Sequence, residues 1–251
     1  MNFVRTLLHA YLYLPYSYRR LTGTGVFGRQ QATYIEHHQP GDGNPLKKAL
    51  WKHHVKQFHE AACSVATVVG VINAIRELLY SDLPIVTQLD ILEKVRTADW
   101  KERMSGGGHR GRRGLPLPVL GAVVQNSLEA YTLPYAAVET IQAHKQAQQA
   151  KPIRSMLWQW LQSFEQQGAC LMIAHFDQGA YIPALNIPHI SPVGGFDPIS
   201  GDVIILDVDP SQKKFYRVTF DTFYRGLASN FHHVFKPFGY GSGGCVIVKL
   251  L

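Results

Sequence analysis

The sequence predicts an α+β fold, with helices in the N-terminal half of the chain and an antiparallel sheet in the C-terminal half. Up to Gly168, apolar residues recur mostly three or four positions apart, a spacing that is typical of helices. Beyond it, short apolar runs alternate with turn residues, as they do in strands. Because the helices precede the strands, we expect segregated helices and sheet instead of repeated βαβ units.

The length and composition fit one large globular domain. The chain has 251 residues, of which 46% are hydrophobic and 17% charged, so it can bury a sizeable core. This composition excludes a wholly disordered chain and a collagen-like repeat. We expect residues 46–251 to form the domain, and residues 1–45 to form a segment that packs on it or on a dimer partner.

The start of the chain, Met1–Leu21, is apolar and rich in tyrosine. Arg5 comes early in this run, and no small-residue cleavage site ends it, so a signal peptide is not expected. The run is also too short and too often interrupted to cross a bilayer, so no transmembrane segment is expected. An amphipathic surface segment or a dimer arm is the alternative to packing on the domain.

Helical periodicity then accounts for most of the chain up to Gly168. It predicts helices over Cys63–Tyr80, Val86–Ala98, Leu117–Tyr131 and Ile153–Gln167. A basic, glycine-rich loop, Ser105–Gly114, separates the second helix from the third. Gly168 follows the fourth helix, at the position where glycine commonly ends a helix.

Strands are expected after Gly168. Apolar runs predict them over Ala169–Phe176, Val203–Val208, Phe215–Val218 and Cys245–Leu250. One helix, Phe220–Ala228, interrupts the series.

The charge balance leaves several kinds of partner open. Lys and Arg number 25 and Asp and Glu 18, which gives a net charge of +7. A positive chain can bind nucleic acid or an anionic surface, or attract small acidic substrates. No aromatic residues lie between the arginines of the loop Ser105–Gly114, and no recognised nucleic-acid module surrounds it, so no nucleic-acid partner is expected.

The chain has only three cysteines, Cys63, Cys170 and Cys245. An odd, sparse set cannot form a disulfide framework, so the fold does not depend on an oxidising compartment and we expect a cytoplasmic protein. Cys170 and Cys245 lie in apolar runs and are expected to be buried as small hydrophobic residues. Histidine pairs occur without a CxxC or HExxH motif or a closed set of four ligands, so no metal site is expected.

Cys63 differs from the other two cysteines because it begins a predicted helix. Backbone N–H groups and the helix dipole stabilise a thiolate there. A cysteine nucleophile also needs a base, usually His, and a group that orients the base. His189 and Asp207 are candidates, since a hairpin could bring their two segments together, and Gln57 could donate to an oxyanion. Taken singly, each of these residues is more often structural than catalytic.

Taken together, these residues resemble a known family. The segment His189–Gly195 (HISPVGG), followed by Ile205–Val208 (ILDV), looks like the His and Asp segment of the phytochelatin synthases. The separation of 18 residues from His to Asp, and of 6 from Gln57 to Cys63, agrees with the family pattern. Two further segments, Gly114–Val123 and Phe215–Leu227, resemble the family more weakly. The resemblance covers the chain in pieces, from Gln57 to Leu250.

The resemblance implies a papain-like cysteine transferase or hydrolase that acts on glutathione, with residues 46–251 as the catalytic domain. Cys63 would attack the Cys–Gly carbonyl, His189 would move the proton, Asp207 would hold the imidazole, and Gln57 with the Cys63 N–H would form the oxyanion hole. The chain lacks the Cys-rich C-terminal region of the plant enzymes, which favours the short bacterial type, where hydrolysis dominates over γ-glutamylcysteine transfer. A homodimer is implied, no cofactor is required, and a heavy-metal thiolate of the peptide is a further substrate form.

The sequence also departs from the family pattern. Ser64 stands where the family has Gly after its nucleophile, and Pro188 where it has Gly before its His. Two family arginines, expected to hold the γ-glutamyl end of the substrate, align with Asp177 and Gly243. A different peptide or amide substrate therefore stays open, as does a non-catalytic binding protein on the same fold.

Substrate-binding candidates lie in two places. Ser191 is part of the His segment, and Arg110, Arg112 and Arg113 belong to the basic loop. Guanidinium groups bind carboxylates in pairs of hydrogen bonds, so the loop could hold an acidic substrate. A plain solvated loop is an equally good interpretation.

Overall fold

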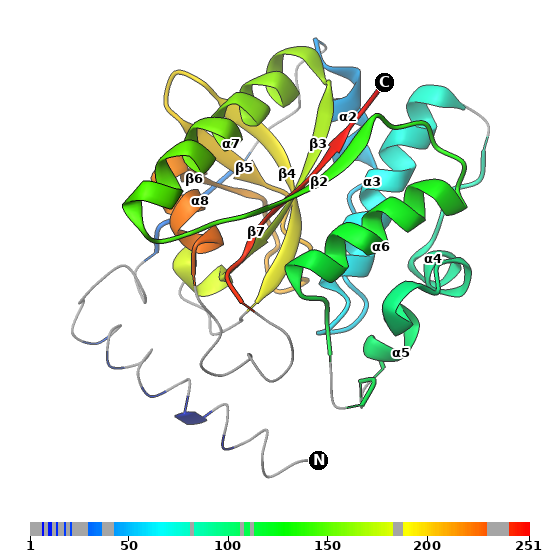
Figure 1. Cartoon of the computed structure of the whole chain (residues 1–251), viewed down its shortest axis with the longest axis horizontal. Coiled ribbons are helices and arrows are strands. Elements are labelled where there is room, and N and C mark those ends of the chain that lie inside the picture. The colour runs from blue at the N-terminus through cyan, green and yellow to red at the C-terminus, as the bar shows by residue number, and fades with distance from the viewer. Residues whose placement is uncertain are drawn as a thin grey trace.

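The structure is a computed structural model. It describes residues 30–36, 43–80, 83–105, 108–110, 113–182, 188–229 and 241–251, with single positions at residues 7, 10, 11, 14, 18 and 21. It confirms a mixed α+β fold built on an antiparallel sheet (Figure 1).

One seven-stranded sheet forms the centre of the fold. Its strands are β1 (Thr33–Tyr34), β2 (Ala137–Gln142), β3 (Cys170–Phe176), β4 (His189–Asp197), β5 (Asp202–Ile205), β6 (Tyr216–Thr219) and β7 (Gly244–Lys249). Their order in the sheet is β1-β6-β5-β4-β3-β7-β2, and every neighbouring pair is antiparallel. The strands from β3 to β6 form a meander, so segments that follow one another in the sequence lie side by side.

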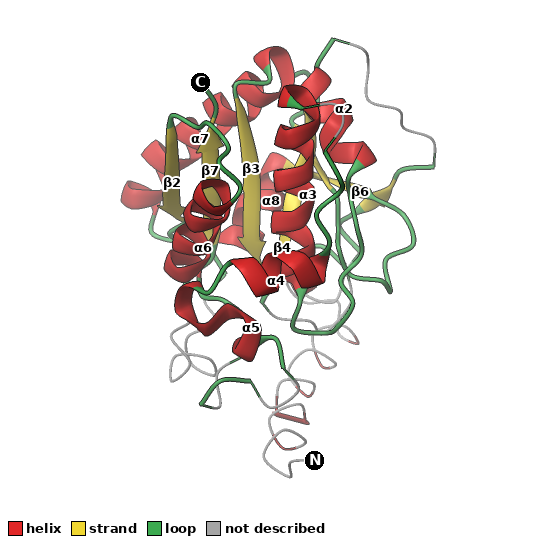
Figure 2. Cartoon of the chain, turned by 90° about the vertical axis from the view of Figure 1, so that its right-hand side faces the viewer, coloured by secondary structure: helices red, strands yellow, loops and turns green. Residues whose placement is uncertain are grey.

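Helices cover both faces of this sheet. They are α2 (Pro45–Lys52), α3 (Cys63–Leu79), α4 (Gln88–Lys94), α5 (Trp100–Arg103), α6 (Leu117–Ala130), α7 (Ala147–Gln167) and α8 (Phe220–Leu227). Figure 2 shows α3 and α6 in front of the sheet and α7 and α8 behind it.

The helix α3 is the core helix of the molecule. Every residue from Cys63 to Ile75 is buried, and only the last turns reach the surface. A helix that is apolar on all sides must be enclosed, and α3 packs against β4, α2 and α6. This places the N-terminus of α3 at a fixed point beside the sheet.

The predicted elements are present, with shifted boundaries. The fourth predicted helix begins at Ala147 instead of Ile153, because Pro152 is accommodated inside α7 near its exposed start. The second is shorter, since α4 ends at Lys94 and a 3₁₀ turn with two left-handed residues, Ala98 and Asp99, follows it. Gly168 ends α7 with a φ of 63°, as expected of a helix-terminating glycine.

The elements α2, α5, β1, β2 and β4 are not in the predicted series. The helix α2 is short, but the Asn44 side chain caps it by accepting a hydrogen bond from the Lys47 N–H at 2.9 Å, and Pro45 starts it. The strands β1 and β2 come before α7 in the chain, so the sheet is not confined to the part that follows Gly168. Neither strand shows a clear alternation of buried and exposed residues, because each lies at an edge of the sheet.

The N-terminal segment is described only in part. Residues 30–36 contact the domain, since the N–H groups of Gln31 and Ala32 donate to the Tyr181 carbonyl at 2.9 and 3.0 Å and β1 pairs with β6. The rest of the prediction for residues 1–45 falls mainly outside the described residues. No helix among the described residues is long and apolar enough to span a bilayer.

Candidate active site

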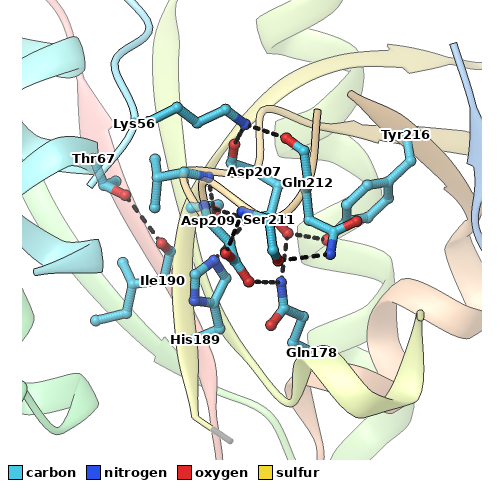
Figure 3. Close-up of polar contacts among 12 residues, drawn as sticks. Lys56, Thr67, Gln178, His189, Ile190, Asp207, Asp209, Ser211, Gln212 and Tyr216 are labelled. Atoms are coloured by element: carbon cyan, nitrogen blue, oxygen red, sulfur yellow. Dashed lines mark hydrogen bonds and ion pairs between the residues drawn. The ribbon is translucent and has the colours of Figure 1, made fainter. Parts of the chain in front are cut away.

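Two elements bring Cys63 and His189 together at the start of the central strand β4. Cys63 is the first residue of α3, and His189 is the first residue of β4. The Thr67 hydroxyl, one turn into α3, donates to the Ile190 carbonyl at 3.1 Å and ties the helix to the start of the strand (Figure 3). The Phe176 ring packs edge-on against the imidazole of His189, with ring centroids 5.5 Å apart. The imidazole is therefore held between the sheet and the helix N-terminus.

Cys63 is placed as a nucleophile requires. Its side chain is close enough to His189 to raise the pKa of that imidazole, and the residue is 7% exposed, so it is enclosed but still reachable. The N–H groups of Val65 and Ala66 donate to the Ala62 carbonyl, whereas among the described residues the N–H of Cys63 has no backbone acceptor. That N–H can donate to an oxyanion that forms next to the sulfur.

His189 is bound on its other side by Asp207. The Nε2 atom of His189 lies 2.8 Å from the Oδ1 atom of Asp207, and both side chains are almost fully buried. Because Nε2 is engaged there, Nδ1 is the ring nitrogen left for Cys63. The three side chains thus lie in series, in the order in which a nucleophile, a base and an orienting acid work.

The charges of these groups support proton transfer from sulfur to imidazole. Burial alone would lower the pKa of His189, but the charge and hydrogen bond of Asp207, with those of Cys63, raise it to about 10. Burial alone would raise the pKa of Asp207, but the charge and hydrogen bond of His189, helped by Tyr216, hold it well below its usual range. At neutral pH the site therefore favours an imidazolium held against the Asp207 carboxylate.

Asp207 is held by more than His189 (Figure 3). Its Oδ1 also accepts from the Asp209 N–H at 2.8 Å. Its Oδ2 accepts from the Tyr216 hydroxyl at 2.6 Å and from the Gln178 amide at 3.0 Å. These donors satisfy a carboxylate that is fully buried.

The segment before Cys63 is bonded to the same loop. Both the Lys56 Nζ and the His54 Nε2 bond to the Asp207 carbonyl, at 2.6 and 3.0 Å. The Gln57 N–H donates to the Val208 carbonyl at 2.8 Å. Burial lowers the pKa of His54 to about 4, so that imidazole is neutral at pH 7. The stretch that carries the candidate oxyanion donor is thus fixed to the stretch that carries the acid.

Gln57 has the surroundings expected of an oxyanion donor. The residue is 8% exposed, and its Oε1 is buried without a hydrogen bond. Within the described part of the chain, its side-chain amide makes no hydrogen bond, so its N–H groups are available to a ligand. Burial of an amide that forms no hydrogen bond costs free energy, and a hydrogen bond to a bound ligand would offset that cost.

The predicted substrate-binding residues fall in different surroundings. Ser191 is fully buried, and its Oγ accepts from the Val208 N–H at 3.3 Å, so it joins β4 to the Asp207 loop. Arg113 lies 2.9 Å from Glu60, three residues before Cys63, which puts the end of the basic loop beside the segment that leads to Cys63. Arg110 is exposed, and Arg112 lies outside the described residues.

The departures from the family pattern have structural counterparts. The Oγ of Ser64, which stands in place of the family Gly, is buried and accepts from the Trp100 indole at 3.0 Å. Asp177 is buried and accepts from the Gly179 N–H at 3.0 Å, and burial raises the pKa of Asp177 to about 7. A Cβ atom on Gly243 would lie 2.1 Å from the His175 carbonyl oxygen, so this backbone accepts no side chain there.

Sequence reasoning missed Tyr216, Gln178 and Lys56. Tyr216 lies in a strand that was predicted, but nothing in the local sequence shows that its hydroxyl meets Asp207. Gln178 follows β3 and Asp207 follows β5, 29 residues later, so their contact depends on how both strands pair with β4. Lys56 stands next to Gln57, and that proximity is the one sequence feature that could have drawn attention to it.

Within the described residues, no group of three or more His, Cys, Asp and Glu side chains is arranged to hold a metal ion. Comparison with models of known protein families gives no match for this chain, and no curated protein matches its sequence significantly.

Proposed function

We propose that the chain is a papain-like cysteine enzyme of the phytochelatin synthase type, which cleaves the Cys–Gly bond of glutathione or of a similar small thiol peptide. The observation that carries this proposal is the series Cys63, His189 and Asp207: the His189 Nε2 lies 2.8 Å from the Asp207 Oδ1, and Cys63 is close enough to raise the pKa of the same imidazole. A buried core helix that starts at the nucleophile and packs on an antiparallel sheet supports the papain-like part of the proposal.

In the first half-reaction the Cys63 thiol gives its proton to His189 and attacks the carbonyl carbon of the Cys–Gly bond. The Cys63 N–H and the Gln57 amide donate to the oxyanion. As the C–N bond breaks, His189 returns the proton to the departing glycine amine, which leaves a γ-glutamylcysteinyl thioester on sulfur. Asp207 keeps the imidazole oriented during both transfers and stabilises its protonated form between them.

In the second half-reaction the thioester passes to an acceptor. Water attacks it after giving a proton to His189, which releases γ-glutamylcysteine and restores the thiol. The α-amine of a second thiol peptide can attack in the same way and form a longer peptide. A divalent heavy metal would enter only as a thiolate complex of the peptide substrate. The Arg113 guanidinium, beside the nucleophile segment, is placed to hold an acidic group of that substrate.

A second candidate keeps the chemistry and changes the substrate. The buried carboxyl group of Asp177, and a Gly243 that has no room for a side chain, stand where arginines would hold the γ-glutamyl end of glutathione. These two positions favour a papain-like peptidase or amidase that acts on another peptide.

The test is glycine release from glutathione by the full chain, with a panel of small peptides and amides read by mass spectrometry. Cys63→Ala and Cys63→Ser should lower turnover by about 10³-fold or more. Cys170→Ala, the loss of a fully buried cysteine in β3, is the matched control and should keep turnover. Full activity of Cys63→Ala would refute the proposal. If glutathione does not react but another peptide acylates Cys63, the second candidate is favoured. If no amide acylates Cys63, the chain is a non-catalytic binding protein.

A further inference from the structure

The Asp207 carboxylate is oriented by two residues that take no part in the proposed proton transfers. Its Oδ1 faces His189, while its Oδ2 is bound by the Tyr216 hydroxyl at 2.6 Å and by the Gln178 Nε2 at 3.0 Å (Figure 3). Tyr216 comes from β6, and Gln178 from the 3₁₀ turn Gln178–Ala180 that follows β3. The carboxylate is thus held from two elements that carry none of the reacting groups.

Tyr216 is suited to this task because its hydroxyl remains a donor. The side chain is fully buried, and burial, together with the Asp207 charge, raises the pKa of Tyr216 well above its ordinary value. A hydrogen bond to a carboxylate is stronger than one between neutral groups, and it is directional. With Oδ2 fixed in this way, the carboxylate cannot rotate away from the imidazole.

The orientation of Gln178 is dictated by charge. Its Nε2 bonds to Asp207 at 3.0 Å and also to the Oδ2 of Asp209 at 3.3 Å. A flipped amide would turn its oxygen towards two carboxylates, so only one orientation is stable. The opposite Oε1 is buried without a hydrogen bond among the described residues. The structure thus leaves one buried amide oxygen unsatisfied and keeps the amide nitrogen on the two acids.

We propose that Tyr216 and Gln178 are positioning residues, which hold the Asp207 carboxylate on His189 and thereby keep the imidazole oriented to activate Cys63. This inference rests on the proposed function, since it concerns the same three side chains. It needs no knowledge of the substrate, because the reactivity of Cys63 can be measured with a small alkylating reagent.

The other charged or titratable groups around Asp207 are unchanged by the substitutions that test this proposal. They are His189 from β4, Asp209 from the same loop, and Lys56 and His54 from the segment after α2. Tyr216→Phe removes a neutral hydroxyl and keeps the ring, and Gln178→Met removes a neutral amide and keeps the length of the side chain. Any change in Cys63 reactivity would therefore come from lost orientation of the carboxylate and not from lost charge.

The matched control is Tyr181→Phe. Tyr181 is also fully buried, and its hydroxyl also makes one hydrogen bond, but it donates at 2.9 Å to the Phe223 carbonyl instead of to Asp207. The two Tyr→Phe variants thus lose the same buried group, and only one of them loses a contact with the acid.

The experiment measures the rate of Cys63 alkylation by iodoacetamide from about pH 5 to about pH 9, with the labelled peptide quantified by mass spectrometry. Tyr216→Phe and Gln178→Met should be alkylated about tenfold more slowly than wild type at the acid end, where the reactive sulfur depends on the imidazolium. All proteins should converge at the alkaline end, where a thiol ionises without help. Tyr181→Phe should follow wild type throughout.

The outcomes separate this inference from the proposed function. If Cys63 of the wild type reacts at acid pH no faster than in the unfolded chain, the activated cysteine itself is refuted. If the wild type reacts fast but Tyr216→Phe and Gln178→Met match Tyr181→Phe, the proposed function stands and the positioning role falls. If both variants lose the folded circular dichroism spectrum while Tyr181→Phe keeps it, these contacts serve the fold, and the positioning role is likewise contradicted.

Discussion

The backbone N–H of Gln57 donates to the carbonyl of Val208 at 2.8 Å. Val208 directly follows Asp207, the candidate acid, and Gln57 is the candidate oxyanion donor. Lys56 strengthens the junction, since its Nζ donates to the carbonyls of Asp207 and Gln212 at 2.6 and 2.7 Å. The oxyanion donor and the acid are therefore parts of one rigid unit, and substitutions there separate effects on transition-state binding from effects on the nucleophile.

Gln57→Ala should lower turnover and leave the nucleophile intact. Loss of one oxyanion donor typically lowers kcat by about 10²- to 10³-fold. Cys63 would still lie beside His189, so its rate of alkylation should stay within about twofold of the wild-type rate, because a substitution that leaves a contact intact has little effect on it. A parallel fall in turnover and alkylation would show that Gln57 supports the fold of the site instead of the oxyanion.

Asp207→Asn should change how stability depends on alkaline pH. The folded-state pKa of His189 is raised to about 10, chiefly because Asp207 outweighs the effect of burial. A raised pKa stabilises the fold below about pH 6.5, the unfolded value, and this contribution is lost as the pH rises from there through the folded value. Urea unfolding should show wild-type stability falling across that window and a flatter profile for Asp207→Asn. Equal slopes in the two proteins would contradict the ion pair.

His175→Leu should flatten the acid side of the stability profile. His175 is fully buried in β3, and burial lowers the pKa of His175 to about 4. A lowered histidine pKa means that the unfolded chain takes up the proton first, so stability falls as the pH drops from about 6.5 to the folded value, by about 3 kcal/mol for this group. The measurement is the free energy of unfolding at a series of acid pH values. An unchanged acid slope in the variant would show that His175 does not titrate in this way.

Gly243→Arg should unfold the site instead of creating a γ-glutamyl binding group. A Cβ at this position would lie 2.1 Å from the His175 carbonyl oxygen and 2.8 Å from that of Leu227, and both are backbone atoms that cannot move aside cheaply. Overpacking of this kind costs about 3 kcal/mol or more, which thermal unfolding would detect. Gly43→Ala, which meets nothing within 4 Å, is the control and should be neutral. A stable Gly243→Arg variant that gains activity on glutathione would contradict this arrangement.

Substitutions of Arg113 and of Glu60 should change the substrate affinity in opposite directions. Their side chains lie 2.9 Å apart beside the nucleophile segment. If Arg113 also binds an acidic group of the substrate, Arg113→Gln should raise KM by about tenfold with little change in kcat, the pattern of a lost uniform binding contact. Glu60→Gln removes this ion pair and should lower KM. Steady-state kinetics check both, and a fall in kcat without a change in KM would assign Arg113 to another role.

The sequence was sufficient for the elements that follow simple periodicity. Thirteen consecutive buried residues in α3 give an apolar segment whose helical spacing is plain, and the apolar runs of β3 and β7 are equally clear. The proximity of His189 and Asp207 followed from a predicted hairpin, and β4 and β5 do pair as antiparallel neighbours.

What could not be predicted depends on tertiary contacts. The eight residues of α2 are too few for a stable isolated helix, and its cap at Asn44 and its packing on α3 decide that it forms. The hydrogen bonds to Asp207 come from Tyr216 in β6 and from Gln178 in the turn after β3, so they form only once the strands have assembled. Hydrophobic spacing carries no information about which buried hydroxyl meets which carboxylate.

The most direct test of the central claim is intact-mass spectrometry of the protein after brief reaction with glutathione and an acid quench. The proposal expects a γ-glutamylcysteinyl adduct that peptide mapping places on Cys63, that Cys63→Ala lacks, and that Cys170→Ala retains. An adduct on another residue, or catalysed glycine release without any thioester on Cys63, would contradict the assignment of Cys63 as the nucleophile.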